Sequence, residues 1–187
     1  MMKLAYAFCG SFCTHKRALE ALRALAPGND VTPVLSETVQ NTDTRFGRAF
    51  ELAEEARLIT GARPVTEIKE AEDTVTRGGF DAVIISPCTG NTLAKLAAGI
   101  TDGVVTMCAK AQLRSLRPVV IAPATNDGLG ANLKNVAALL ERKNVYFVPF
   151  GQDDPEEKPN SLVCDFSLVG ETLESALRGK QIQPVLL

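Results

Sequence analysis

The sequence has no long run of hydrophobic residues. Its longest apolar stretch, residues 4–9, has only six members, whereas a helix that crosses a membrane needs about 20. The N-terminus enters a strand-like segment and lacks the layout of a signal peptide. We therefore expect a cytoplasmic protein.

Positive charge is scarce and dispersed. Lysine and arginine number 20 against 22 acidic residues, which gives a formal net charge of -2. The largest basic cluster is Lys16-Arg17 beside His15, so the electrostatic footprint of a nucleic-acid-binding protein is missing. With 187 residues, of which 45% are hydrophobic, the chain fits a single domain over residues 1–187.

The cysteines lack the spacing of a disulfide framework or a zinc site. Five are present, an odd number, at Cys9, Cys13, Cys88, Cys108 and Cys164, which favours reduced thiols in a cytosolic compartment. Cys9 and Cys13 have no second pair nearby, and the chain has one histidine. We therefore expect small, partly buried apolar side chains and no bound metal.

What the sequence does contain is a regular alternation of β-branched runs and helix-forming segments. The runs at 3–8, 30–36, 82–85, 118–121 and 145–149 predict strands. Helical periodicity separates them, and a final helix follows near residue 173. This order predicts an α/β fold of three layers, a doubly wound parallel sheet of Rossmann-like or flavodoxin-like type with about five strands.

Several helix faces are expected to point inward on the basis of their spacing. The helix that closes near Gly61 is expected to bury Phe46, Ala49, Phe50 and Ala53, and the one before Lys143 to bury Leu133, Val136, Ala137 and Leu140. Similarly, Leu93, Leu96, Ala97 and Ile100 are assigned to an inward face, and a final helix is expected through Leu173, Ala176 and Leu177.

Small polar residues follow the first four predicted strands. Gly10-Ser11 comes after the first, Ser36 after the second, residues 86–92 after the third and residues 122–130 after the fourth. The carboxyl ends of parallel strands share one edge of a sheet, where ligands bind. A strand, a glycine turn and a helix N-terminus offer free N–H groups to an anion. The G-x-G-x-x-G pattern is absent, so a tight turn without a ligand is the alternative reading of residues 9–14.

Residues 150–160 are acidic and contain two prolines. This composition predicts a long loop rather than a strand or helix. We assign residues 150–161 to a lid or a docking loop.

The strings 86–102 and 113–123 resemble the flavoprotein superfamily that contains the flavin-dependent cysteine decarboxylases and the flavin prenyltransferases. The likeness extends from Gly10-Ser11 to the last helix. More narrowly, the strings 41–47, 89–91, 125–127, 147–155 and 158–161 are similar to the family of dipicolinate synthase B subunits. These subunits serve spore formation in endospore-forming bacteria.

The resemblance implies an FMN site built from four loops. The corresponding residues are Gly10, Ser11, Phe12, Ser36, Thr89, Gly90, Asn91, Thr92, Pro123, Ala124, Thr125 and Asn126. Hydroxyl and amide groups at helix N-termini suit the FMN phosphate.

Two departures argue against the other activities of the superfamily. The cysteine decarboxylases carry a histidine after their second helix and a P-x-M-N-x-x-M-W stretch, whereas here His15 is the only histidine and residues 123–126 are followed by Asp127-Gly128. The prenyltransferases carry an Arg-Glu pair where Ala124-Thr125 stands. Without that arginine a prenyl phosphate loses a bidentate partner.

The implied function is that of an oxidoreductase subunit. A dipicolinate synthase B subunit acts with an A subunit that resembles a nicotinamide-dependent dehydrogenase, and the pair oxidises a dihydrodipicolinate-level precursor to dipicolinate in the mother cell of a sporulating bacterium. The alternatives are an FMN-dependent decarboxylase or prenyltransferase and a non-catalytic scaffold subunit. The superfamily also implies a homo-oligomer, a trimer or a multiple of one.

A substrate with two carboxylates needs cationic or N–H partners. The candidates are Arg45, Lys110, Lys158 and Asn160. We expect Asp153, Asp154, Glu156 and Glu157 to point away from the substrate and toward the A subunit, with Lys158 and Asn160 turned back over the site. No residue is a convincing general base. His15 could instead have a surface or capping role, and Cys88 could instead be a buried packing residue.

Overall fold

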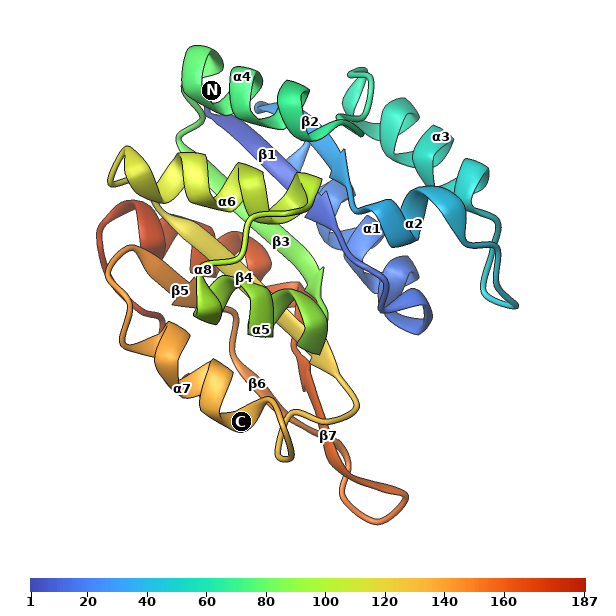
Figure 1. Ribbon diagram of the computed structural model, residues 1–187, viewed down its shortest axis with the longest axis vertical. Helices are drawn as coiled ribbons and strands as arrows, with labels where there is room; N and C mark the ends of the chain where they lie inside the picture. The colour runs from blue at the N-terminus through green and yellow to red at the C-terminus, as the bar shows by residue number, and fades with distance from the viewer.

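A mixed sheet of seven strands forms the centre of the computed structural model, which describes all residues from 1 to 187 (Figure 1). The strands are β1 (Lys3–Phe8), β2 (Asp30–Leu35), β3 (Ala82–Cys88), β4 (Val119–Thr125), β5 (Val145–Phe147), β6 (Phe150–Asp154) and β7 (Lys158–Cys164). Their order is β2-β1-β3-β4-β7-β6, and β5 also pairs with β4. Strands β1 to β5 are parallel, whereas β7 is antiparallel to both β4 and β6.

Eight α-helices flank this sheet. They are α1 (His15–Leu25), α2 (Glu37–Asn41), α3 (Ala49–Thr60), α4 (Ile68–Gly78), α5 (Gly90–Ala98), α6 (Val104–Arg114), α7 (Leu133–Leu140) and α8 (Val169–Leu177). In Figure 1, α4, α5 and α6 lie in front of the sheet, and α1 and α8 lie behind it. The expected three-layer α/β fold is therefore confirmed. None of the helices has the length and apolar character that crossing a membrane requires.

The central strands are apolar because both faces of the sheet are covered. Every residue of β3 is buried, as expected for a parallel strand between two helix layers. One polar group in this core is fully paired: the Tyr6 hydroxyl donates to the Ala18 carbonyl oxygen at 2.8 Å and lies 2.9 Å from Ser86 Oγ. Buried polar groups are tolerated when they are hydrogen-bonded in this way.

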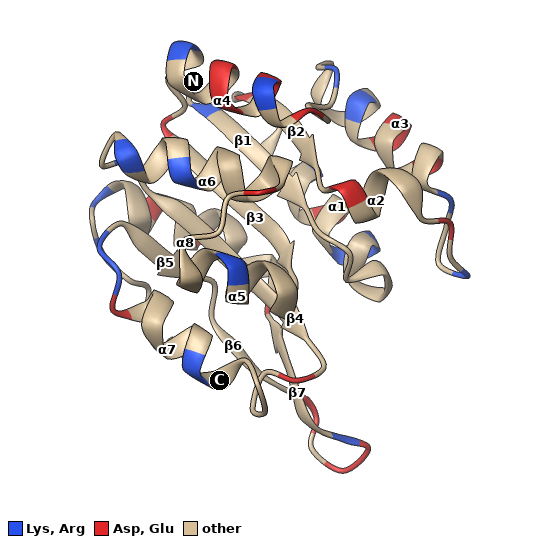
Figure 2. Cartoon of the chain, in the orientation of Figure 1, with Lys and Arg blue, Asp and Glu red and all other residues tan.

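Residues 150–160 are not a loop, so that expectation was wrong. They form most of the β6–β7 hairpin, with a turn at residues 155–157. The reason is that the end of β4 needs a partner: Ala124 and Thr125 pair with Val163 and Leu162 of β7. The hairpin protrudes from the lower edge of the sheet in Figure 1, and Figure 2 shows acidic residues at its tip.

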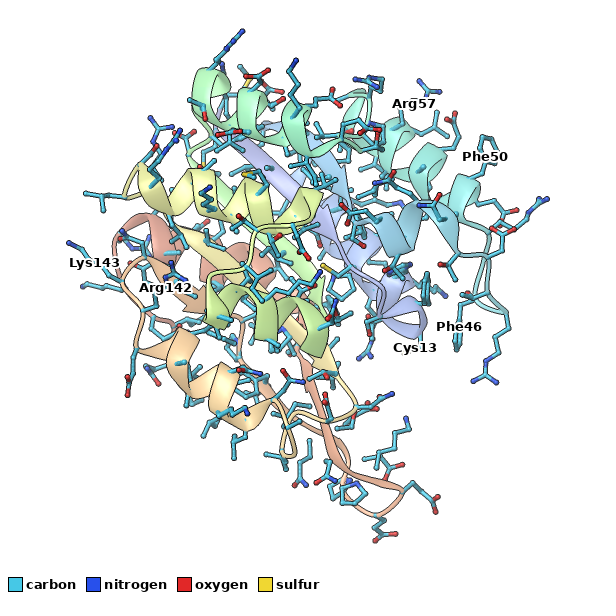
Figure 3. The ribbon with its side chains drawn as sticks, viewed as in Figure 1. Cys13, Phe46, Phe50, Arg57, Arg142 and Lys143 are labelled. Carbon is cyan, nitrogen blue, oxygen red and sulfur yellow. The ribbon has the colours of Figure 1, made fainter.

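Several expected inward faces were also wrong. Helix α3 begins at Ala49 and buries Leu52 and Ala56, while Phe46 and Phe50 are 55% and 72% exposed (Figure 3). The apolar residues in this region form two stripes, and the stripe that faces the sheet is that of Leu52 and Ala56, not that of Phe46 and Phe50. Ile100 is likewise exposed, at 46%.

Helix α7 shows the same kind of difference. It buries Val136 and Leu139, whereas Leu133 and Leu140 are 49% and 38% exposed and Ala137 faces solvent. The apolar side of this helix that was expected to face the core is thus mostly outside.

Candidate functional site

The carboxyl ends of β1, β2 and β3 open into one cavity of about 420 Å³. The paired registers of these strands bring the turn after Phe8, Ser36 after Leu35 and Thr89 after Cys88 to the same edge. The lining residues are Cys9, Gly10, Ser36, Glu37, Thr38, Thr89, Asn91, Thr92, Lys95, Asp102, Gly103, Val105 and Thr106. The volume lies within the range of about 300–1,000 Å³ that is usual for small-molecule sites.

Three helices begin at this cavity, since the N-cap residues of α2, α5 and α6 (Ser36, Thr89 and Gly103) all line it. The Ser36 hydroxyl accepts the N–H of Val39 at 3.4 Å, and the Thr89 hydroxyl accepts the N–H of Thr92 at 3.3 Å. Three positive ends of helix dipoles therefore converge on one space.

Free backbone donors remain at two of these helix ends. The first helical hydrogen bonds are donated by Gln40 and Leu93, so the amides of residues 37, 38, 90 and 91 have no acceptor within their helices. Gly10 lets the turn after β1 approach α2 closely, because a Cβ on residue 10 would lie 3.1 Å from Thr38 Cγ2. The donor set is the kind that binds a phosphate group.

Two carboxylates at the cavity wall already have partners. Glu37 Oε1 accepts the N–H of Val104 at the start of α6, at 2.9 Å. Asp102 accepts from Lys95 Nζ at 2.9 Å, and this hydrogen bond lowers the pKa of the Asp102 carboxyl. The Glu37 carboxylate therefore satisfies the α6 N-terminus, which leaves the α2 and α5 N-termini for an external anion.

The loop after β4 does not reach this cavity directly. Pro123 and Ala124 are buried within β4, Thr125 is half-buried and Asn126 is exposed. The Thr125 hydroxyl donates to Asp127 Oδ1 at 2.6 Å, and both Asp127 oxygens accept from Asn132 Nδ2 at 2.9 Å. The hydrogen bond from Thr125 lowers the pKa of the Asp127 carboxyl.

This polar network packs against the start of α5. A Cβ on Gly90 would lie 2.6 Å from Thr125 Oγ1 and 2.8 Å from Asp127 Oδ1. Gly90 lies between Thr89 and Asn91, which both line the cavity. The predicted residues at the end of β4 therefore reach the cavity wall only through their packing against Gly90.

Ser11 and Phe12 lie beside the cavity rather than in its lining. Phe12 contributes instead to a second cavity of about 580 Å³ between the start of α1 and the segment that leads into α3. That cavity also contains His15, Thr42, Thr44 and Phe46.

His15 is held by the turn after β1. Its Nε2 donates to the Cys9 carbonyl oxygen at 2.8 Å, and its ring packs edge-on against Phe12 with centroids 5.2 Å apart. Burial lowers the pKa of the imidazole, so the ring is neutral at pH 7. The side chain lines the second cavity and not the first.

The buried imidazole predicts a stability that depends on pH. Because the pKa of His15 is lower in the folded chain than the ordinary value of 6.5, the unfolded chain binds more protons below that pH, and the free energy of unfolding falls as the pH falls. His15→Gln, which keeps an N–H donor for Cys9, removes this contribution. We expect the urea midpoint of the wild type to drop more between pH 7.5 and pH 5.5 than that of the variant. Equal drops would show that the imidazole is not perturbed.

The cysteines are free, and four of them are buried. Burial raises the pKa of the Cys9 thiol to about 11 and that of Cys108 to about 12, and it holds the pKa of Cys88 well above its ordinary value. A thiol of this kind is protonated at neutral pH and is a poor nucleophile. Cys88 is therefore better described as a packing residue than as a nucleophile or base. No cluster of three or more potential metal ligands is present.

The four candidate substrate residues do not gather at the cavity. The Arg45 guanidinium lies 4.8 Å from the centroid of the Phe46 ring, and Lys110 points to solvent from α6. Lys158 forms an ion pair of 3.0 Å with Asp153 inside the hairpin rather than turning over the site. The exposed Asn160 contacts the 126–130 loop through its carbonyl oxygen, which accepts the N–H of Leu129 at 3.0 Å.

Lys95 is the cation of the cavity, and it was not predicted from the sequence, nor were Glu37, Asp102 and Thr106. The signal that could have found Lys95 is its position six residues after the Thr89 N-cap, on the helix that starts at the predicted loop.

A larger cavity of about 820 Å³ lies between α1 and the β6–β7 hairpin. It contains none of the predicted cofactor residues, so we assign the site to the smaller cavity.

Comparison with known proteins gives consistent matches along the chain. The flavoprotein family model matches residues 2–174. The dipicolinate synthase B subunit of Bacillus subtilis (strain 168) is 40% identical over 186 residues, which cover 99% of this chain and 93% of the relative. The flavin prenyltransferase UbiX of Thermoplasma acidophilum is 36% identical over 102 residues, covering 50% of this chain and 57% of that protein.

Two solved structures agree with these sequence matches. The crystal structure of the dipicolinate synthase B subunit from Bacillus halodurans C superposes with a TM-score of 0.91 and 43% identity, covering 100% of this chain and 96% of that one. The FMN-dependent cysteine decarboxylase SpaF superposes with a TM-score of 0.66 and 26% identity, covering 94% and 97%.

Proposed function

This chain belongs to the flavoprotein family, and from that membership we propose that it is the FMN-binding B subunit of a dipicolinate synthase. The observation that carries the proposal is the cavity at the carboxyl edge of the sheet, onto which the free amides at the starts of α2 and α5 open. Two relatives named as dipicolinate synthase B subunits share nearly their whole length with this chain.

The residues of the cavity fit the phosphate end of FMN. The free amides at the starts of α2 and α5 and the hydroxyls of Ser36, Thr38 and Thr89 would bind the phosphate oxygens. Lys95 would add a positive charge. The end of β4, with Thr125 and Asn126, is the proposed contact for the flavin ring.

FMN, or the nicotinamide of the A subunit, would accept the hydride from a dihydrodipicolinate-level substrate, which also loses a proton as its ring becomes aromatic. The task of the chain itself is to position the substrate. Arg45, Lys110, Lys158 and Asn160, the residues expected to bind the two carboxylates, do not converge on the cavity, and we propose that NAD(P) is carried by the A subunit.

The experiment that tests this proposal uses the purified chain alone and with its A subunit. We expect the chain to bind FMN, seen as flavin absorbance that stays with the protein, and the pair to form dipicolinate when the chain carries FMN. A chain that cannot be loaded with FMN would instead be a scaffold subunit. Turnover of a peptidyl cysteine or a prenyl phosphate without any partner would place it with the other enzymes of its superfamily.

The β6–β7 hairpin is the proposed contact with the A subunit. Its tip carries Asp153, Asp154, Glu156 and Glu157, and Asp154 Oδ1 shapes the turn by accepting the N–H groups of Glu156 and Glu157 at 3.2 and 3.0 Å. Asp153 pairs with Lys158 at 3.0 Å, and Glu156 and Glu157 are exposed. Figure 2 shows these acidic residues at the protruding tip. A protruding acidic tip suits a basic partner surface.

Neutralising these four acids is expected to weaken association with the A subunit. The variant Asp153→Asn, Asp154→Asn, Glu156→Gln, Glu157→Gln keeps the acceptor oxygen of residue 154, so the turn is preserved. We expect an affinity loss of about tenfold at low salt that shrinks at high salt, measured by titration at two ionic strengths. Glu171→Gln with Glu174→Gln on α8 is the control. Unchanged partner binding together with loss of FMN would place the hairpin over the cavity.

We further propose that the protein acts in the cytoplasm of the mother cell and forms a homo-oligomer. Both follow from the family membership and from the resemblance to dipicolinate synthase B subunits.

A further inference from the structure

The second cavity, of about 580 Å³, lies beside the cavity assigned to FMN. The two cavities share α2 as a wall, since Ser36 lines the first and Val39 and Thr42 line the second. They also share the turn after β1, where His15 of the second cavity donates to the carbonyl oxygen of Cys9, a lining residue of the first. A molecule in the second cavity would therefore be a close neighbour of FMN in the first.

The lining of the second cavity has one basic side chain without an acidic partner. Arg23 is paired with Glu55. Arg48 is paired with Glu51, at 2.7 Å. Lys16 is exposed and takes part in none of the ion pairs within the chain. Since all five side chains line the cavity, its charge is positive by one, which an anionic ligand would neutralise.

Aromatic rings line this cavity from two segments of the chain. Phe12 lies in the turn that precedes α1, and Phe46 lies in the segment that leads into α3. The backbones of Thr44 and Gly47 exchange hydrogen bonds of 3.0 and 3.2 Å, so Phe46 is held on a closed turn although its side chain is 55% exposed. Figure 3 shows Phe46 beside Cys13, which also lines the cavity. The faces of such rings suit a flat, unsaturated ligand.

We propose that the second cavity binds the substrate, a flat ring with two carboxylates, and that Lys16 binds one carboxylate while the Phe46 ring packs against the face of the ligand. The identity of this ligand rests on the proposed function. The Thr42 hydroxyl, which also lines the cavity, is available to the second carboxylate. Cation, hydroxyl and aromatic ring thus meet in one space, whereas the four candidates expected from the sequence lie apart.

Cys13 provides a local probe of this cavity, because it lines the cavity and is the one exposed cysteine of the chain. Dipicolinate, the proposed product, has the ring and both carboxylates of the substrate. We expect dipicolinate to slow the alkylation of Cys13 by iodoacetamide in the folded chain, both with and without FMN. Pyridine-2,6-dicarboxamide has the same shape without the charge, and as the control ligand it is expected to leave the rate unchanged.

Two pairs of variants test the named side chains by equilibrium dialysis, with dipicolinate detected by its absorbance. Lys16→Gln is expected to weaken dipicolinate binding about tenfold, because a charge-assisted hydrogen bond is lost, and to leave FMN affinity unchanged. Lys143→Gln is the control, since Lys143 is exposed and lies on the opposite side of the view in Figure 3. Phe46→Leu is expected to weaken binding about threefold to tenfold, whereas Phe46→Tyr keeps the ring and the affinity.

The outcomes separate this inference from the proposed function. Equal dipicolinate affinity for the wild type and Lys16→Gln, or a Cys13 alkylation rate that dipicolinate does not change, would overturn the inference even in a chain that binds FMN. Equal protection by the dicarboxamide would also overturn it, because the cavity would then not recognise carboxylates. Dipicolinate binding that depends on Lys16 in a chain that cannot be loaded with FMN would contradict the proposed function and support the inference. Circular dichroism confirms that each variant is folded.

Discussion

Ser36→Asp is expected to abolish FMN binding while the fold stays intact. Asp is as good an N-cap residue as Ser, so α2 keeps its capping hydrogen bond to the N–H of Val39. The new carboxylate, however, lies in the cavity at a free helix N-terminus, where the phosphate would bind. At about 4 Å and a surface-like effective dielectric, two like charges repel by about 4 kcal/mol, which corresponds to roughly a thousandfold loss of affinity. Flavin fluorescence titration measures it.

Ser36→Asn is the matched control for this experiment. Asn has the size and the capping ability of Asp but no charge, so it is expected to bind FMN within about tenfold of the wild type. Comparable FMN affinity for the Asp and Asn variants would show that the phosphate does not lie at the start of α2. Loss of binding in both would point to a packing effect at residue 36.

The location of the cavity could be predicted from the sequence because the turns that form it are short-range features of the chain. Gly10, Ser36 and Thr89 each lie within two residues of the end of an apolar strand, and parallel strands bring their carboxyl ends to one edge. The caps of α2 and α5 are formed with residues three positions further along the chain. Such short-range patterns are visible without a structure.

The charged part of the cavity could not be predicted in this way. Glu37 reaches the start of α6 across 67 residues of sequence, and Lys95 meets Asp102 only because the chain turns back after α5. These contacts depend on how the helices dock. The contribution of Glu37 is therefore a product of tertiary structure, whereas the position of Lys95 after the Thr89 N-cap is a signal within one helix.

The β6–β7 hairpin was missed for a related reason. Its sequence, with Asp153, Asp154 and two prolines, has a low strand propensity. It becomes a hairpin because Val163 and Leu162 complete the pairing of β4 and because Phe150 pairs with Cys164. Partners far away in the sequence outweigh the local preference.

Gly90→Ala is expected to disrupt both the site and the stability of the fold. A Cβ at this position would overlap Asn132 Nδ2 and would lie 2.6 Å from Thr125 Oγ1 and 2.8 Å from Asp127 Oδ1. None of these atoms can retreat without breaking the hydrogen bonds that Asp127 receives from Thr125 and Asn132. Overpacking of this kind costs about 1–3 kcal/mol.

The measurable result is a Tm lower by about 3–10 °C, together with weaker FMN binding, because the first turn of α5 moves away from the position proposed for the phosphate. Gly78→Ala provides the control, since a Cβ there would lie 4.0 Å from Thr74 Cγ2 and α4 has room for it. Gly78 is the last residue of α4, so that change is expected to raise stability by no more than about 0.5 kcal/mol, the low end of the effect of replacing a helical glycine. If both variants raise the Tm, Gly90 is not packed against the Thr125–Asp127–Asn132 network, and the end of β4 would then have no connection to the cavity.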